Sequence, residues 1–90
     1  MAVINKQAYE VEFENGSTVQ MFFTLQESGA FKYGNQTEVS LETVSSYGKS
    51  EDYFDTRYDM TINADGSNFD EWCRRLIGAA FRPAKKIEEI

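Results

Sequence analysis

Residues 7–26 read QAYEVEFENGSTVQMFFTLQ, and they carry the strongest structural signal in the chain. Apolar and acidic side chains alternate from Tyr9 to Glu14, as in a strand with one buried and one solvent-facing side. A second alternating run follows at residues 18–26, and the Asn15-Gly16 pair between the runs is typical of a hairpin turn. We therefore expect two antiparallel strands joined by a tight loop.

The parity of the two runs predicts the length of this loop. A two-residue turn would place Glu12 opposite Val19 and so mix the acidic and apolar faces. A three-residue loop over 14–16 places Val11 opposite Val19, and the apolar faces then coincide. The sequence thus predicts a type I turn followed by a bulge, with Gly16 in the left-handed conformation.

Further strands are expected between this hairpin and residue 62. Residues 31–33 have the composition of a short strand. Residues 37–44 fit a strand by alternation, but Leu41, Val44 and Tyr47 also fit one face of a helix; the Thr, Val and Ser content favours the strand. Residues 49–52 are expected to form a polar turn. A long strand is expected over residues 53–62, with Phe54, Tyr58, Met60 and Ile62 facing inward and Asp55, Arg57 and Asp59 facing outward.

An amphipathic helix is predicted after residue 68. Its apolar positions recur at helical spacing: Phe69, Trp72, Cys73, Leu76, Ile77 and Ala80. Ser67 or Asn68 is the expected N-cap, and Pro83 should stop the helix. Residues 84–90 are expected to be a loose tail. The chain should thus form one α+β domain over 1–90, a small antiparallel sheet of about four strands with the C-terminal helix packed on one face.

The residue types argue against an enzyme. The chain has no histidine, the commonest general base and metal ligand. Its one cysteine, Cys73, lies on the apolar face of the helix and is expected to be a buried structural thiol. Residues 63–67 share Asp and Gly with a calcium loop, but Thr61 and Trp72 occupy positions that require carboxylates. No catalytic residue, cofactor or metal is predicted.

The charge is acidic and unevenly distributed. The net charge is −6, and residues 1–71 hold thirteen acids against four bases. Such a surface repels nucleic acid and anionic membrane, so we expect neither as a direct partner. The N-terminal residues lack the apolar core of a signal peptide, and a cytoplasmic location is expected.

Carboxylates in rows are the most distinctive feature of the predicted surface. Successive outward residues of a strand lie about 6.8 Å apart, twice the strand rise. The predicted contact surface joins five carboxylates and two aromatic residues on the polar side of their strands: Glu10, Glu12, Glu14, Asp55, Asp59, Phe22 and Tyr53.

We expect this surface to bind another protein that presents a basic face. The chain would then be a small inhibitor or regulator that occupies the basic surface of a nucleic-acid-handling protein, as a nucleic-acid mimic. Small phage-encoded inhibitors of host defence systems share this character, although no motif here matches such a family. The alternative is a homo-oligomeric structural or accessory subunit, such as a homodimer, that associates through strand edges and aromatic residues. A third reading is that the carboxylates only keep the domain soluble.

Overall fold

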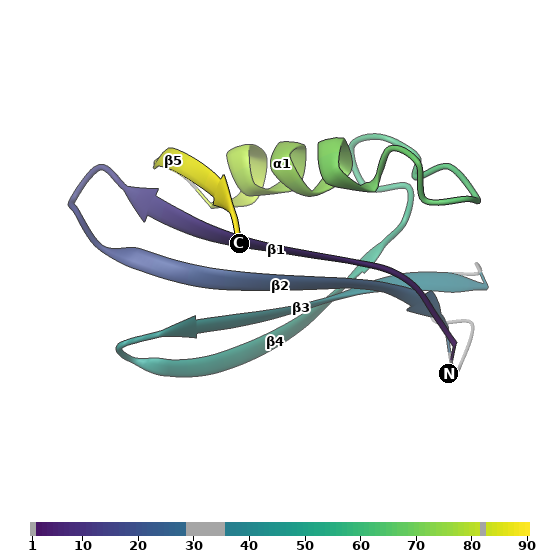
Figure 1. Cartoon of the computed structure of the whole chain (residues 1–90), viewed down its shortest axis with the longest axis horizontal. Helices are drawn as coiled ribbons and strands as arrows, with labels where there is room; N and C mark the ends of the chain where they lie inside the picture. The colour runs from purple at the N-terminus through teal and green to yellow at the C-terminus, as the bar shows by residue number, and fades with distance from the viewer. Residues whose placement is uncertain (1, 29–35, 82) are drawn as a thin grey trace.

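An antiparallel sheet and one helix make up the fold (Figure 1). The computed structural model describes residues 2–28, 36–81 and 83–90. The elements in these residues are β1 (Val3–Phe13), β2 (Thr18–Glu27), β3 (Thr37–Ser45), β4 (Gly48–Asp55), α1 (Phe69–Ala80) and β5 (Ala84–Glu89). The sheet order is β4-β3-β2-β1-β5. The predicted α+β class is confirmed, with five strands in place of about four.

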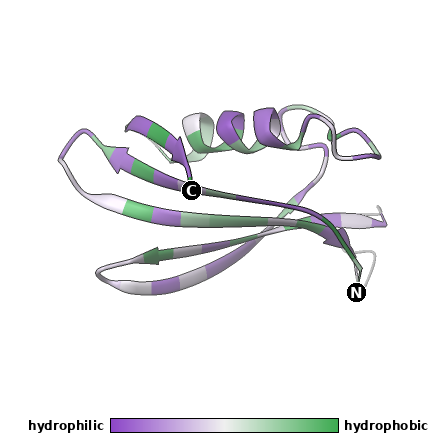
Figure 2. Cartoon of the chain, viewed as in Figure 1, coloured by the Kyte–Doolittle hydropathy of each residue, from purple (hydrophilic) through white to green (hydrophobic). Residues whose placement is uncertain are grey.

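The first hairpin has the predicted loop. Val11 pairs with Val19, and the Phe13 N–H donates to the Ser17 carbonyl at 2.9 Å. Gly16 has a φ of 87°, in the left-handed region that glycine adopts without strain. Figure 2 shows the resulting alternation of apolar and polar residues along β1 and β2. The parity argument is therefore confirmed.

Residues 37–44 form a strand, as their composition favours, but the expected turn at 49–52 and the expected strand beyond residue 55 are wrong. Residues 49–52 belong to β4 and are not a turn, because the chain reverses earlier, between the paired Ser45 and Gly48. As an edge strand, β4 is held by backbone pairing to β3 and needs no alternation of polar and apolar side chains. The residues expected to form a short strand at 31–33 lie outside the described residues.

The expected strand over 53–62 ends at Asp55 for a local reason. The Asp55 carboxylate accepts hydrogen bonds from the Arg57 N–H and guanidinium at 2.8 Å, which turns the backbone away from β3. Ile62 is buried as expected, but Tyr58 is 43% exposed and does not face the core. Residues 56–68 then return to the start of α1 in turns.

Residues 84–90 are not a loose tail. Residues 84–89 are β5, which pairs antiparallel with β1, so that Ile87 lies opposite Val11. Ile87 is partly buried and packs against the core, while Pro83 separates β5 from α1. Because β5 is short and rich in charge, its composition hides its role as a strand.

The helix forms where its periodicity predicts, and its apolar side packs on the sheet. Trp72 lies edge-on to Phe23 of β2, with ring centroids 6.4 Å apart. The buried side chains of α1 are Phe69, Trp72, Cys73, Leu76 and Ile77, whereas Ala80 is exposed. Asn68 occupies the N-cap position without a side-chain cap, because its amide instead binds Asn63 and the Thr61 carbonyl in the preceding loop. In the described part of the chain no helix is long and apolar enough to cross a membrane.

Candidate functional site: the open face of the sheet

The sheet has one face packed against α1 and one face that we call the open face. Tyr9, Met21 and Leu41 point toward α1 and are buried. Side chains of a strand alternate between the two faces, so the residues flanking these three point the other way. The strand register then fixes which residues of the open face are neighbours.

The structure brings five of the seven predicted site residues to this face. Glu10 and Glu12 on β1, Phe22 on β2, and Tyr53 and Asp55 on β4 have the required parity. They lie on both sides of the sheet centre, with β3 between β2 and β4.

The other two predicted residues, Glu14 and Asp59, lie elsewhere. Glu14 is in the first hairpin loop, where its N–H donates to the Pro83 carbonyl at 3.2 Å. Asp59 follows the end of β4, and its carboxylate pairs with Arg75 of α1 at 3.0 Å. The expectation that Asp59 extends the acidic row of a strand fails because that strand ends at Asp55.

Pairs of carboxylates face each other across neighbouring strands, and local sequence patterns do not reveal them. Glu10 lies opposite Glu88, Glu42 opposite Glu51, and Glu38 opposite Asp55. Like charges directly opposite each other on one face of a sheet are destabilising. These pairs could have been found only with the β3–β4 and β1–β5 registers, which the sequence did not predict.

Three lysines have the parity of the open face and lie on different strands: Lys6 on β1, Lys49 on β4 and Lys86 on β5. Lys86 lies opposite Glu12 and pairs with Glu88 at 2.8 Å, and Lys85 approaches Glu12 at 3.9 Å. The hydrogen bond to Glu88 raises the pKa of Lys86. The facing carboxylates of Glu42 and Glu51 are the least balanced, because neither takes part in an ion pair within the described residues.

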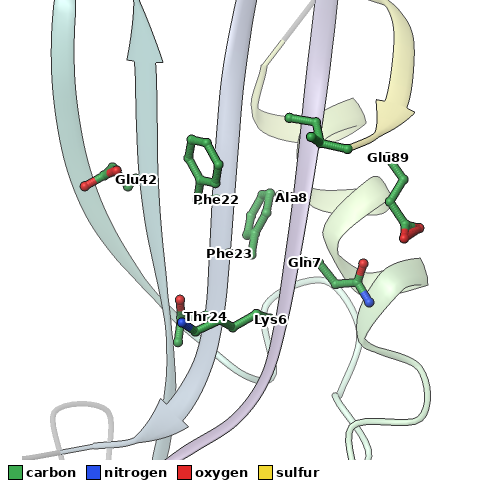
Figure 3. Close-up of a pocket in the computed structure, with 9 residues that line it drawn as sticks. Lys6, Gln7, Ala8, Phe22, Phe23, Thr24, Glu42 and Glu89 are labelled. Atoms are coloured by element: carbon green, nitrogen blue, oxygen red, sulfur yellow. The ribbon is translucent and has the colours of Figure 1, made fainter.

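Two aromatic rings stand among these carboxylates. Tyr53 is 37% exposed, and its hydroxyl donates to Glu51, which raises the pKa of Tyr53. Phe22 is half-buried and borders a hollow of about 420 Å³ that also contacts Lys6, Ala8 and Glu42 (Figure 3). Glu42 and Ala8 lie on either side of Phe22 in the register.

Polar groups between β1 and α1 bind one another and link the helix to the sheet. The Tyr9 hydroxyl donates to Asp70 Oδ1 at 2.6 Å, and Arg74 lies 3.1 Å from the same carboxylate and over the Tyr9 ring. The Tyr9 hydrogen bond, with a smaller effect of Arg74, lowers the pKa of Asp70. Burial raises the pKa of Cys73, which keeps the thiol protonated and unreactive.

The described ranges 2–28, 36–81 and 83–90 contain no group of three Cys, Asp or Glu side chains that could hold a metal ion. Comparison of the chain with protein-family models, with curated proteins and with solved structures gives no match. The assignment of the open face as the candidate site thus depends on its geometry and charge.

Proposed function

We propose that this protein is a small inhibitor or regulator, without catalysis of its own, that binds another protein through its open face. Its partner presents a basic surface, such as the groove of a nucleic-acid-handling protein, and the carboxylates occupy that surface in place of nucleic acid. The observation that carries the proposal is the exposed pair Glu42–Glu51 on β3 and β4. In the other two facing pairs, Glu88 is bound to Lys86, and Glu38 is buried beside Asp55, which is bound to Arg57.

Solubility alone does not account for these pairs. A like-charge pair such as Glu42–Glu51 costs stability, on the order of 0.2–1 kcal/mol. Carboxylates spread over loops and helix surfaces would keep the domain equally soluble without that cost. Within a pair the strands lie about 4.8 Å apart, and the Glu38–Asp55 pair lies four residues, about 13–14 Å, along the strands from the Glu42–Glu51 pair. A basic partner surface relieves the repulsion when it binds, which favours the complex.

The test requires a partner and two matched variants. Affinity capture from the native cell extract or its host identifies candidate partners. The first variant reverses three carboxylates of the open face, Glu10→Lys, Glu42→Lys and Glu51→Lys. The second makes the same change in charge at exposed acids away from this face, Glu27→Lys, Asp52→Lys and Glu71→Lys. Glu88 and Glu89 are unsuitable as controls because they belong to β5.

The association rate constant of the open-face variant with the captured partner should be at least about ten-fold lower than that of the unmodified protein. The dissociation rate constant should change less, since complementary charges mainly steer the encounter of the two proteins. The association rate of the unmodified protein should also fall as salt rises. The control variant should stay close to the unmodified protein. Equal losses in both variants would mean that only net charge matters, and the proposal would then be wrong.

Self-association is the second candidate function. Tyr47, at the tip of the β3–β4 hairpin, is 98% exposed, and β4 has one edge of the sheet to itself. Exposed edges and aromatic side chains favour pairing with another copy. Sedimentation velocity distinguishes the two functions: a stable oligomer that dissociates on Tyr47→Ser favours this candidate, and a monomer at all concentrations excludes it.

A further inference from the structure

The hollow on the open face has an apolar floor. Its volume is about 420 Å³, and Ala8, Phe22 and Ile90 are among the residues that line it. Ala8 and Phe22 are directly opposite each other on β1 and β2, so the single methyl group of Ala8 leaves space beside the Phe22 ring (Figure 3). The volume falls in the range of about 300–1,000 Å³ that is usual for sites that take a small chemical group.

Two carboxylates lie on either side of the Phe22 ring. Glu42 is directly opposite Phe22 on β3, and Glu10 follows Ala8 by two residues on β1. Directly opposite residues have Cβ atoms about 4.5–5.5 Å apart and diagonal ones about 7–8 Å apart, so both carboxylates can reach a group placed over the ring. Both side chains are exposed, and within the described part of the chain neither takes part in an ion pair.

We infer that the hollow binds an arginine side chain of the partner protein. The guanidinium is planar, so it can stack on the Phe22 ring and donate to Glu10 and Glu42 at the same time. Its methylene stem can lie against Ala8. Figure 3 shows the Glu42 carboxylate turned away from Phe22, and this exposed side chain rotates toward the ring when the cation binds.

Charge and shape together select arginine among possible occupants. Lys6 is the one base in the lining of the hollow, and two carboxylates of the same face, Glu42 in the lining and Glu10 beside it, outweigh its charge, which disfavours an anion. Glu89 also borders the hollow, but it is opposite Tyr9 and its carboxylate points away (Figure 3). A lysine ammonium brings the same charge but has no planar face to stack on the ring. The inference rests on the proposed function, since it assumes a protein partner with a basic surface. Arginine is frequent among the residues that contribute most to protein–protein binding.

The test uses the isolated protein and two small probes. The ¹⁵N-labelled protein is titrated with N-acetyl-arginine methylamide and, separately, with N-acetyl-lysine methylamide. The amide signals of Ala8, Phe22 and Glu42 should shift, and the arginine probe should half-saturate them at a lower concentration than the lysine probe. Phe22→Leu should weaken arginine binding about two- to five-fold, the effect expected of an exposed cation–π contact.

Glu42→Gln should weaken the arginine probe about two-fold and Glu71→Gln, on the surface of α1, should not. Because Glu42 is exposed, this pair of variants tests the inference even where Phe22→Leu disturbs the fold. Equal responses to the two probes, or shifts that avoid the hollow, would overturn it. The proposed function would still hold after such a result if the open-face variant, with Glu10, Glu42 and Glu51 changed to Lys, binds the partner more weakly. If the open-face variant binds the partner as well as the unmodified protein does, the proposed function is wrong.

Discussion

Reversing the charge of Glu42 should make the protein more stable and a poorer binder. In the native sheet Glu42 is directly opposite Glu51, and Glu42→Lys turns this repulsive pair into an attractive one. With the charges about 6 Å apart in water, each interaction is worth about 0.7 kcal/mol, so the reversal changes the pair energy by about 1.4 kcal/mol. Screening at physiological salt removes about half of that, which leaves about 0.7 kcal/mol.

A gain of this size should raise the melting temperature by about 3–6 °C, since 1 kcal/mol shifts a domain of this length by about 4–8 °C. Calorimetry or thermal unfolding by circular dichroism measures the shift. Glu27→Lys is the matched control, because it changes the net charge equally but lies opposite Thr37 and not opposite a carboxylate. In 1 M salt the difference between the two variants should nearly vanish.

The reasoning on like-charge pairs would be refuted by equal melting temperatures for Glu42→Lys and Glu27→Lys at low salt. It would also be refuted by a gain that persists in 1 M salt, which would point to packing and not to charge. A stabilised variant that keeps full partner affinity would contradict the link between stability and binding. The expected pattern, more stable and less active, is the trade-off seen where a surface is selected for function.

Three further predictions concern the fold. Gly16→Val should lower the free energy of unfolding by about 1 kcal/mol or more in urea denaturation, because a β-branched residue resists a φ of 87°; Gly16→Asn should cost less. The thiol of native Cys73 should not react with iodoacetamide at pH 8 on the time scale of minutes, and Cys73→Ala should cost about 1 kcal/mol, so rapid alkylation would show that the helix face is exposed. Asp70→Asn should destabilise the protein at pH 7. The pKa of Asp70 is lower in the folded protein than in the unfolded chain. The ionised carboxylate therefore stabilises the unmodified protein at pH values above the unfolded pKa, and this stabilisation disappears as the pH falls through the folded pKa. A difference between Asp70→Asn and the unmodified protein that stays constant from pH 7 to pH 2.5 would argue against this.

Local sequence patterns predicted the elements whose signals are contained within one stretch of chain. The hairpin loop followed from parity, because a slip of one residue would have buried the glutamates of β1. The helix followed from the spacing of Phe69, Trp72, Leu76 and Ile77. Both elements bury most of one side, so the apolar pattern continues through most of their length.

The elements that were missed depend on partners far along the chain. β4 and β5 are edge strands, and edge strands are held by backbone pairing that leaves little trace in the side chains. Part of the candidate site could not be predicted from the sequence for the same reason. Glu42 and Glu51 stand out as functional candidates only when β3 and β4 are aligned, whereas Phe22 was recognised from the parity of its own strand.

The strands of the sheet differ in how readily they detach, and β5 should detach more readily than β2. β5 is a six-residue edge strand with no fully buried side chain, whereas β2 is central and buries Met21, Phe23 and Leu25. Fewer buried contacts therefore hold β5 to β1 than hold β2 in the sheet. β5 should therefore detach in brief local openings while β1 to β4 and their turns stay intact, and its amide protons should exchange with solvent sooner than those of β2. During each opening the edge of β1 from Tyr9 to Phe13 is bare, and this is the moment at which a foreign strand could take the place of β5.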